Sequence, residues 1–372
     1  MPNERDLVQT VAAAIKDENL PWTAGPTSVS ALPAAEQQKR LGVLVTDAER
    51  QRLAADRARF AAQEQQTLGA AVGAPAAVDW RNHNGNYVTS VKDQGQCGSC
   101  VGFCSCSTIE SAVRVKLQNP SYAIDLSEGF LFFCGGASCA NGWGLTSGLD
   151  YAKSTGVVDE ACMPYASSTL NNGTDMNCGA SRCSDWQNRL TKIANYSGYA
   201  TMEARKNAVA AGPVLAGMAV FYDFFAYSSG VYVKSSNTTL AGYHCISVVG
   251  YDDNQQCWIL KNSWGTGWGE AGFVKIRYNQ APLLLDSDWS FYSVDVLIPL
   301  QWYSNVTVAQ TYASRDSQNA WAYIQGLGWR KIYPGAADGV TNMLILFAEA
   351  SANGRPVTIY ADGTYVYQAY LL

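Results

Sequence analysis

Hydrophobic residues recur at helical spacing in several stretches of the first half of the chain. Residues 7–15 predict a short amphipathic helix, and residues 146–154 predict another. Residues 46–68 begin with two acidic positions and are rich in Ala, Gln and Arg, which predicts a longer helix. A further helix is predicted just after Cys100, where apolar residues recur every four positions between polar ones: Ile109, Val113 and Leu117.

Short apolar runs predict strands in the second half. Two runs, at 213–220 and 230–233, precede a closely spaced pair at 245–251 and 258–261. Strands this close in sequence usually lie side by side, so we expect the last two to pair. Beyond Pro299 the pattern predicts strands at 302–308, 343–347, 357–360 and 364–371, a short helix at 319–325, and a hairpin turn at Asp362–Gly363.

Composition narrows the class of protein. The 372 residues are too many for one typical domain, only 15% are charged, and the net charge is −5. The absence of a basic cluster argues against a nucleic-acid partner, and no apolar run approaches the ~18 residues of a membrane span. Eleven cysteines indicate an oxidising compartment. On that ground we expect a secreted protein or one of another oxidising or acidic compartment. Residues 1–20 lack the apolar core of a secretory signal, so we expect no signal peptide in this chain. Either a signal was removed, or the protein leaves the cytosol by another route, or it stays inside.

Cys100 is the strongest candidate for a nucleophile. It follows a glycine-containing turn and opens the predicted helix, where unpaired N–H groups and the helix dipole favour a thiolate. A thiolate needs a base, and the chain has two histidines. His83 lies in a polar turn, whereas His244 stands at the entrance of the strand 245–251. Asn262 ends the neighbouring strand, so its amide is expected to hold the His244 imidazole.

Two other interpretations of these cysteines explain less. Cys97 and Cys100 form a C-x-x-C motif typical of thioredoxin-like enzymes, but that motif gives no role to His244 or Asn262. A zinc site built from Cys97, Cys100, Cys104 and Cys106 would place its ligands too close together on one helix for a tetrahedron. We therefore expect no metal and no cofactor.

Three ordered blocks, Gln94–Phe103, Tyr243–Tyr251 and Ile259–Ile276, resemble the signature segments of papain-like cysteine peptidases. The resemblance covers roughly residues 74–298. It implies an α+β fold in which a helical lobe carries Cys100 and a β-barrel-like lobe carries His244 and Asn262. With the flanking regions this gives three parts: a helical propeptide at 1–74, a catalytic domain at 75–298, and a small β-rich domain at 299–372.

The resemblance also implies the role of each site residue. Cys100 would attack a peptide carbonyl, His244 would act as acid and base, Asn262 would orient His244, and Gln94 would donate to the oxyanion. Endopeptidase cleavage of protein or peptide substrates follows from this set. Two alternatives stay open: transpeptidation or another amide transfer by the same triad, and a non-catalytic binding protein on a peptidase fold.

Several further expectations rest on the same resemblance. The loop 134–143 resembles the segment that binds the substrate backbone, with Gly142 and Trp143 as contacts, and Trp264 would shield the His244–Asn262 bond as part of the substrate-binding set. Cys97 would pair with Cys139, and Cys134 with either Cys178 or Cys183.

The flanking regions give more open predictions. We expect residues 20–30 to cross the cleft of the zymogen, and the flexible stretch at 69–75 to be cut near Ala74. The C-terminal tail contains no cysteine or histidine. Its tryptophans and tyrosines suggest packing, a general interaction surface, or a carbohydrate ligand.

Overall fold

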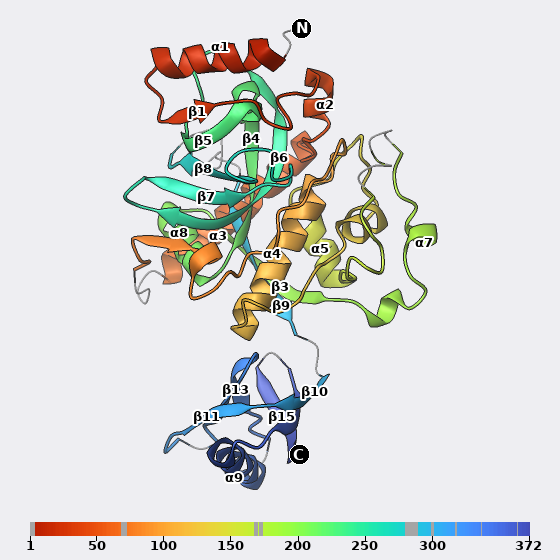
Figure 1. The fold of residues 1–372 in the computed structure, drawn as a ribbon, viewed down its shortest axis with the longest axis vertical. Coiled ribbons are helices and arrows are strands. Elements are labelled where there is room, and N and C mark those ends of the chain that lie inside the picture. The colour runs from red at the N-terminus through yellow and green to blue at the C-terminus, as the bar shows by residue number, and fades with distance from the viewer. Residues whose placement is uncertain are drawn as a thin grey trace. The chain divides into compact units, whose positions relative to one another are not determined.

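The computed structural model describes residues 4–67, 73–166, 170, 174–279, 289–298, 301–316, 318–335, 337–362 and 364–372. These residues form two compact units (Figure 1). The first contains Met1–Ala112 and Ile124–Asp295, and the second contains Val113–Ala123 and Val296–Leu372. Residues 1–74 belong to the same unit as Cys100 and His244. The division between a propeptide at 1–74 and a catalytic domain from residue 75 therefore stays a prediction.

The helices of the first unit confirm the predicted helical stretches, with Leu68 outside the described residues. Their bounds are α1 (Glu4–Asp17), α2 (Ala34–Gln38), α3 (Asp47–Thr67), α4 (Cys100–Leu117), α5 (Ser147–Ser154), α7 (Cys178–Ser181) and α8 (Met202–Ala211). Single helical turns lie at Trp80–Asn82, Phe130–Cys134, Trp186–Asn188 and Tyr222–Ala226. In the part of the chain that is described, no helix is both long enough and apolar enough to cross a membrane.

The strands of the first unit form one mixed sheet, and β5, β6, β7 and β8 lie to the left of α4 in Figure 1. Its order is β1-β5-β8-β7-β6-β4-β9-β3, with β2 paired to β6. The bounds are β1 (Trp22–Ala24), β2 (Ala77–Asp79), β3 (Lys192–Tyr199), β4 (Val214–Phe221), β5 (Tyr227–Tyr232), β6 (Leu240–Asp252), β7 (Cys257–Lys261), β8 (Phe273–Arg277) and β9 (Phe291–Leu297). The predicted pairing of the two closely spaced strands is confirmed, because β6 and β7 are antiparallel neighbours.

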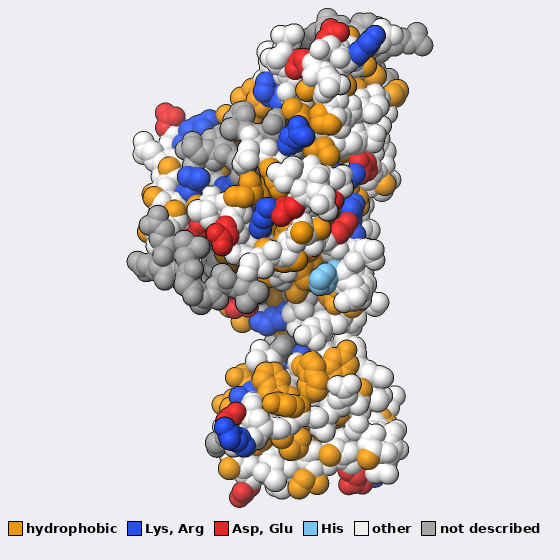
Figure 2. Space-filling view, turned by 90° about the vertical axis from the view of Figure 1, so that its left-hand side faces the viewer, with side chains coloured by type: hydrophobic (Ala, Val, Ile, Leu, Met, Phe, Trp, Pro, Cys, Tyr) orange, Lys and Arg blue, Asp and Glu red, His pale blue; other side chains and the backbone are white. Residues whose placement is uncertain are grey.

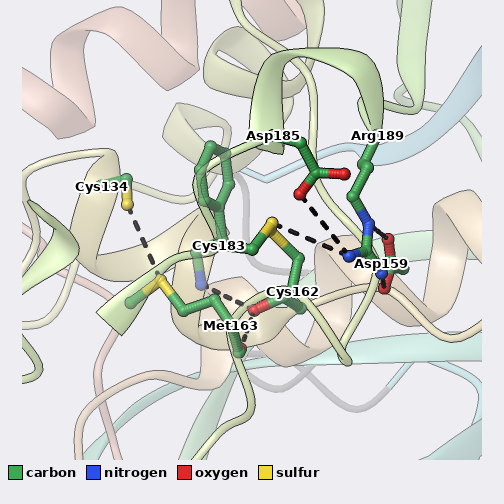
Figure 3. Close-up of a disulfide and its surroundings, with 9 residues drawn as sticks. Cys134, Asp159, Cys162, Met163, Cys183, Asp185 and Arg189 are labelled. Atoms are coloured by element: carbon green, nitrogen blue, oxygen red, sulfur yellow. Dashed lines mark hydrogen bonds and ion pairs between the residues drawn. A yellow bond between two sulfur atoms is a disulfide. The ribbon is translucent and has the colours of Figure 1, made fainter. Parts of the chain in front are cut away.

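Three disulfides hold the loops of the helical side. The expected Cys97–Cys139 bridge is present, and Cys134 pairs with Cys178 rather than Cys183. Cys183 instead pairs with Cys162, a bridge that the sequence did not predict (Figure 3). Beside it, the Arg189 guanidinium bonds to the Asp159 carboxylate and reaches the Cys183 sulfur at 3.8 Å. These bridges indicate that the chain folds in an oxidising environment.

The second unit packs one helix against a six-stranded sheet of order β10-β14-β15-β13-β12-β11. The bounds are β10 (Gln301–Val306), β11 (Val308–Ala313), β12 (Ala320–Ile324), β13 (Gly328–Ile332), α9 (Ala337–Asn353), β14 (Val357–Ala361) and β15 (Tyr365–Leu371). Every pairing is antiparallel except that of β13 with β15. Hydrophobic side chains also gather on the surface of this unit (Figure 2).

Two sequence predictions for this unit are wrong. Residues 343–347 were predicted as a strand but lie within α9, which buries Val340, Phe347 and Ala350 on one face. Residues 319–325 were predicted as a helix but contain β12, whose alternate residues are buried: Ala320, Ala322 and Ile324. Both stretches are short apolar runs, for which helical and strand periodicity are hard to distinguish. The final two strands do pair antiparallel, although Gly363 of the predicted turn lies outside the described residues.

Candidate active site

Cys100 is the first residue of α4, as the sequence predicts. Its side chain is fully buried. The preceding loop is fixed by the Cys97–Cys139 disulfide and by the Gly98 N–H, which donates to the Cys139 carbonyl at 3.0 Å. This arrangement holds the thiol at a helix N-terminus, where the helix dipole favours an anion.

His244 and Asn262 meet at the same end of the β6–β7 pair. Ser247 of β6 lies opposite Lys261 of β7, so the side chains just beyond that pair are close in space. The distance between His244 Nε2 and Asn262 Oδ1 is 2.8 Å. Trp264 is fully buried, and its ring centroid lies 4.9 Å from that of His244.

Gln94 is buried beside these groups, and its amide is held on both sides. Its Oε1 accepts a hydrogen bond from the Ser263 hydroxyl at 2.7 Å. Its Nε2 donates to the Cys97 carbonyl at 2.7 Å and to the Arg40 carbonyl at 3.1 Å. A residue from the N-terminal region therefore occupies the donor that the sequence assigned to the oxyanion.

The stretch Arg40–Leu44 covers the site. The Trp143 N–H donates to the Gly42 carbonyl at 2.8 Å, and the Leu44 N–H donates to the Trp143 carbonyl at 2.8 Å. On the opposite side, the Val43 N–H donates to the Tyr243 carbonyl at 3.2 Å. The backbone of this N-terminal stretch thus bridges the loop before α5 and the strand that carries His244.

Two glycines, Gly42 and Gly142, make this close approach possible. A Cβ on Gly42 would lie 1.8 Å from the Gly98 carbonyl oxygen, and a Cβ on Gly142 would lie 2.1 Å from the Gly42 carbonyl oxygen. Gly142 also has a φ of +68°, which side chains disfavour. The backbones therefore touch where no side chain fits.

This arrangement corrects the expectation that residues 20–30 cross the cleft. The strand β1 within that range pairs instead with the sheet edge at β5. The Thr27 hydroxyl donates to the Phe225 carbonyl at 2.8 Å, which fixes the following turn on the same lobe. A glycine between two apolar residues, Leu41 and Val43, is the sequence signal that would have identified the covering stretch.

An ion pair and a polar contact fix the covering stretch beside the Gln94 loop. The buried Arg40 guanidinium pairs with Asp93 at 2.6 Å, one residue before Gln94. Two residues after Gln94, the Gln96 amide donates to the Glu36 carboxylate at 2.7 Å. Neither partner in the N-terminal region was identified from the sequence.

Burial keeps the candidate nucleophile and base uncharged. It raises the pKa of the Cys100 thiol to about 12, although N–H groups of Cys245, Gly42 and Val101 favour the thiolate. It also lowers the pKa of His244 to about 4, against the opposing effects of Asn262 and the Arg40 carbonyl. The backbone groups that oppose these two shifts include those of Gly42 and Arg40, which are two residues apart in the same short stretch.

The second histidine lies elsewhere. His83 follows the helical turn at Trp80–Asn82 and packs against Trp80, with ring centroids 4.4 Å apart. Trp143, another predicted substrate contact, packs edge to face with Phe132, with ring centroids 6.0 Å apart. The structure therefore brings together Cys100, His244, Asn262 and Gln94 around one stretch of backbone, with Gly142 and the Trp143 main chain on its rim.

The family model described as papain family cysteine protease matches residues 74–289. This chain belongs to the papain family. The papain-like resemblance and the α+β fold predicted from the sequence are thereby confirmed.

Named members of the papain family show the same likeness. Cysteine proteinase 1 of Entamoeba histolytica is 33% identical over 216 residues, which cover 55% of this chain and 64% of that protein. Cathepsin B-like CP3 of Giardia intestinalis is 32% identical over 274 residues, which cover 70% of this chain and 86% of that protein. The chain spans less than two thirds of the length of some relatives. It covers 64% of the Entamoeba protein and 61% of digestive cysteine proteinase 2 of Homarus americanus.

Solved proenzymes of the papain family share the fold. Digestive procathepsin L 3 from the larval midgut of Tenebrio molitor aligns with a TM-score of 0.59 and 22% identity, covering 78% of this chain and 90% of that one. ProCathepsin B S9 from Trypanosoma congolense aligns with a TM-score of 0.61 and 19% identity, covering 77% of this chain and 97% of that one. At these identities the likeness concerns the fold alone.

Proposed function

We propose that this chain is the latent form of a cysteine endopeptidase that uses Cys100, His244 and Asn262. The observation that carries the proposal is the stretch Arg40–Leu44. Its backbone bonds to Tyr243, the neighbour of His244, packs against Gly98, two residues before Cys100, and accepts a hydrogen bond from the Gln94 amide. A backbone in this place excludes a substrate backbone from the same donors. The N-terminal region would therefore act as an inhibitory propeptide.

The chemistry follows from which atoms are already engaged. Because Asn262 holds Nε2 of His244, Nδ1 is the nitrogen left to exchange a proton with Cys100. The thiolate attacks the scissile carbonyl, and the Cys100 N–H and Gln94 amide stabilise the oxyanion. Removing one such donor lowers kcat by about 10²–10³-fold in other hydrolases. His244 then protonates the leaving amine, and later activates water to hydrolyse the thioester.

The test is self-processing of the full-length protein. Wild type and Cys100→Ala are incubated separately between pH 4 and pH 7, and intact mass and peptide hydrolysis are followed together. We expect wild type alone to lose a segment ending near Ala74 as hydrolysis appears. Hydrolysis by the intact chain at full rate would exclude the latent form. Products that carry an added amine acceptor would indicate transpeptidation instead.

A further inference from the structure

The C-terminal unit has the strand arrangement of a small closed barrel. Only Thr307 separates β10 from β11, and its carbonyl accepts a hydrogen bond from the Gln325 N–H at 2.9 Å. The two segments are therefore one bent strand, which pairs with β14 through its first half and with β12 through its second. Without the bent strand, β14 and β12 would be the two edge strands of the sheet. The bent strand pairs with both of them and so closes the sheet.

Counting the bent strand once leaves five strands, with α9 between the third and the fourth and a parallel pairing of the third with the fifth. This is the topology of an OB-fold. In OB-folds the face of the second and third strands, with the adjoining loops, binds oligonucleotides or oligosaccharides. Here those strands are β12 and β13, and the loop between the first and second strands runs from Ser314 to Asn319.

Three aromatic side chains surround a hollow of about 320 Å³ on that face: Tyr312, Trp321 and Trp329. They come from β11, β12 and β13, one from each strand. Tyr312 lies directly opposite Trp321, and Trp329 lies opposite Tyr323, so all three rings stand on the side of the sheet away from the core. Tyr312 is 53% exposed.

Two of the three rings of the hollow, Trp321 and Trp329, are held in place by their neighbours. The Trp321 indole N–H donates to Asn319 Oδ1 at 2.8 Å, and the Asn319 amide donates to the Ser314 hydroxyl at 2.9 Å. Trp329 meets Tyr323 edge to face, with centroids 5.6 Å apart. Binding to rings that are already oriented costs little conformational entropy.

The charge of the unit distinguishes between the two ligand classes. Residues 301–372 contain four Lys or Arg and four Asp or Glu, a balance of 4 − 4 = 0. The two other cations of the unit, Arg114 and Lys116, donate hydrogen bonds to the backbone carbonyls of Tyr122 and Val296.

Arg330 is buried and hydrogen-bonds to backbone carbonyls. Lys331 lies beside the hollow, 5.8 Å from the centroid of the Trp321 ring, and Arg315 is an exposed cation of the loop between Ser314 and Asn319. A single-stranded nucleic acid needs a positively charged groove. A neutral pyranose needs an aromatic plane for its C–H face and polar groups for its hydroxyls.

We propose that Tyr312, Trp321 and Trp329 bind a neutral oligosaccharide, with the rings stacked on pyranose faces. Asn319 and Lys331 stand beside the hollow as hydrogen-bonding groups. Such a site holds the attached peptidase unit at a glycan-bearing surface and raises the local concentration of substrates there. The proposal does not depend on the catalytic role of Cys100.

The experiment uses the full chain with Cys100→Ala, which prevents self-cleavage. Its migration is measured in native gels that contain glycol chitin, xylan, laminarin or mannan. We expect retardation by at least one of these polysaccharides, and an apparent affinity about tenfold lower for Trp321→Ala and for Trp329→Ala. Trp321→Phe keeps a ring and should retain most of the affinity.

Trp302→Ala is the matched control. Trp302 is 49% exposed on the same unit but packs against Tyr360, with centroids 4.9 Å apart, rather than lining the hollow. It should migrate like the parent, and thermal unfolding should show that every variant is folded. The proposal is overturned if none of the four polysaccharides retards the parent, or if Trp302→Ala loses affinity equally. It is also overturned if a dT10 oligonucleotide or a proline decamer quenches the tryptophans while the polysaccharides do not bind.

Discussion

At the scale of the residue, the position of the stretch Arg40–Leu44 over the candidate active site depends on Gly42, which has no side chain. Gly42 lies against the Gly98 carbonyl so closely that even one methyl group would overlap with backbone atoms, at 1.8 Å. A flexible side chain could move aside, but the carbonyl belongs to a loop fixed by the Cys97–Cys139 disulfide. The stretch Arg40–Leu44 therefore cannot keep its position when position 42 carries a Cβ.

We expect Gly42→Ala to uncover Cys100 in the unprocessed chain. Iodoacetamide at pH 7.5 should then alkylate Cys100 at least about tenfold faster than in wild type, because exposure returns the thiol pKa toward its ordinary value. Peptide mass spectrometry distinguishes Cys100 from the other free cysteines, which are buried in the protein: Cys104, Cys106, Cys245 and Cys257.

Gly73→Ala is the control for Gly42→Ala, since a Cβ on Gly73 would meet no atom within 4 Å. It should react like wild type. Equal alkylation rates in Gly42→Ala and wild type would show that the covering stretch does not limit access to the thiol.

At the scale of the element, the helix α3 of the N-terminal region packs against the strand β3. Leu53 and Phe60 are seven residues apart, two helical turns, and both are buried. A Cβ on Gly198 would lie 2.1 Å from the Phe60 ring, so β3 receives this ring where it has no side chain. The Glu64 carboxylate accepts a hydrogen bond from the Ala200 N–H at 2.7 Å.

Phe60→Ala should loosen α3 and speed self-processing. Replacing a buried phenylalanine by alanine typically costs about 3–5 kcal/mol in a protein core, and a helix docked on a surface loses a part of that. We expect residues 1–74 to be lost several-fold faster at pH 5, as measured by intact mass over time. Gln51→Ala changes an exposed residue of the same helix and should process at the wild-type rate. If Phe60→Ala also did so, the docking of α3 would not control release.

Where side chains carry the signal, the sequence predicted most of the elements and the proximity of the candidate catalytic groups. Cys100, His244 and Asn262 lie in ordered blocks with distinctive residues, so their neighbourhood could be predicted before any geometry was known. The stretch Arg40–Leu44 makes its contacts mainly through backbone atoms. Gly42 is therefore the one residue in that stretch that indicates these contacts in the sequence. The Cys162–Cys183 bridge was missed because disulfide connectivity depends on how distant loops meet. The strand predicted at 343–347 failed because five apolar residues fit a helix face and a strand equally well.

At the scale of the whole molecule, burial of the candidate base His244 predicts that the stability of the proposed latent form depends on pH. His244 has a pKa of about 4 in the covered state, against 6.5 for an ordinary histidine. Between these values the uncovered or unfolded chain binds more protons than the covered one, so the stability of the covered state falls as pH falls. The stabilisation is fully present above pH 6.5, and the loss by pH 4 is about 3 kcal/mol for this one group.

Thermal unfolding of Cys100→Ala between pH 7 and pH 4, beside the double variant Cys100→Ala/His244→Gln, isolates this contribution. Glutamine takes up no proton, so the double variant should lose several degrees less than the single variant as pH falls. Burial also raises the pKa of Glu128, to about 8, and that of Asp223, but these carboxyls are present in both proteins and their effect cancels in the comparison. Parallel curves for the two variants would mean that acid destabilises the chain through other groups, and that protonation of His244 does not open the covered state.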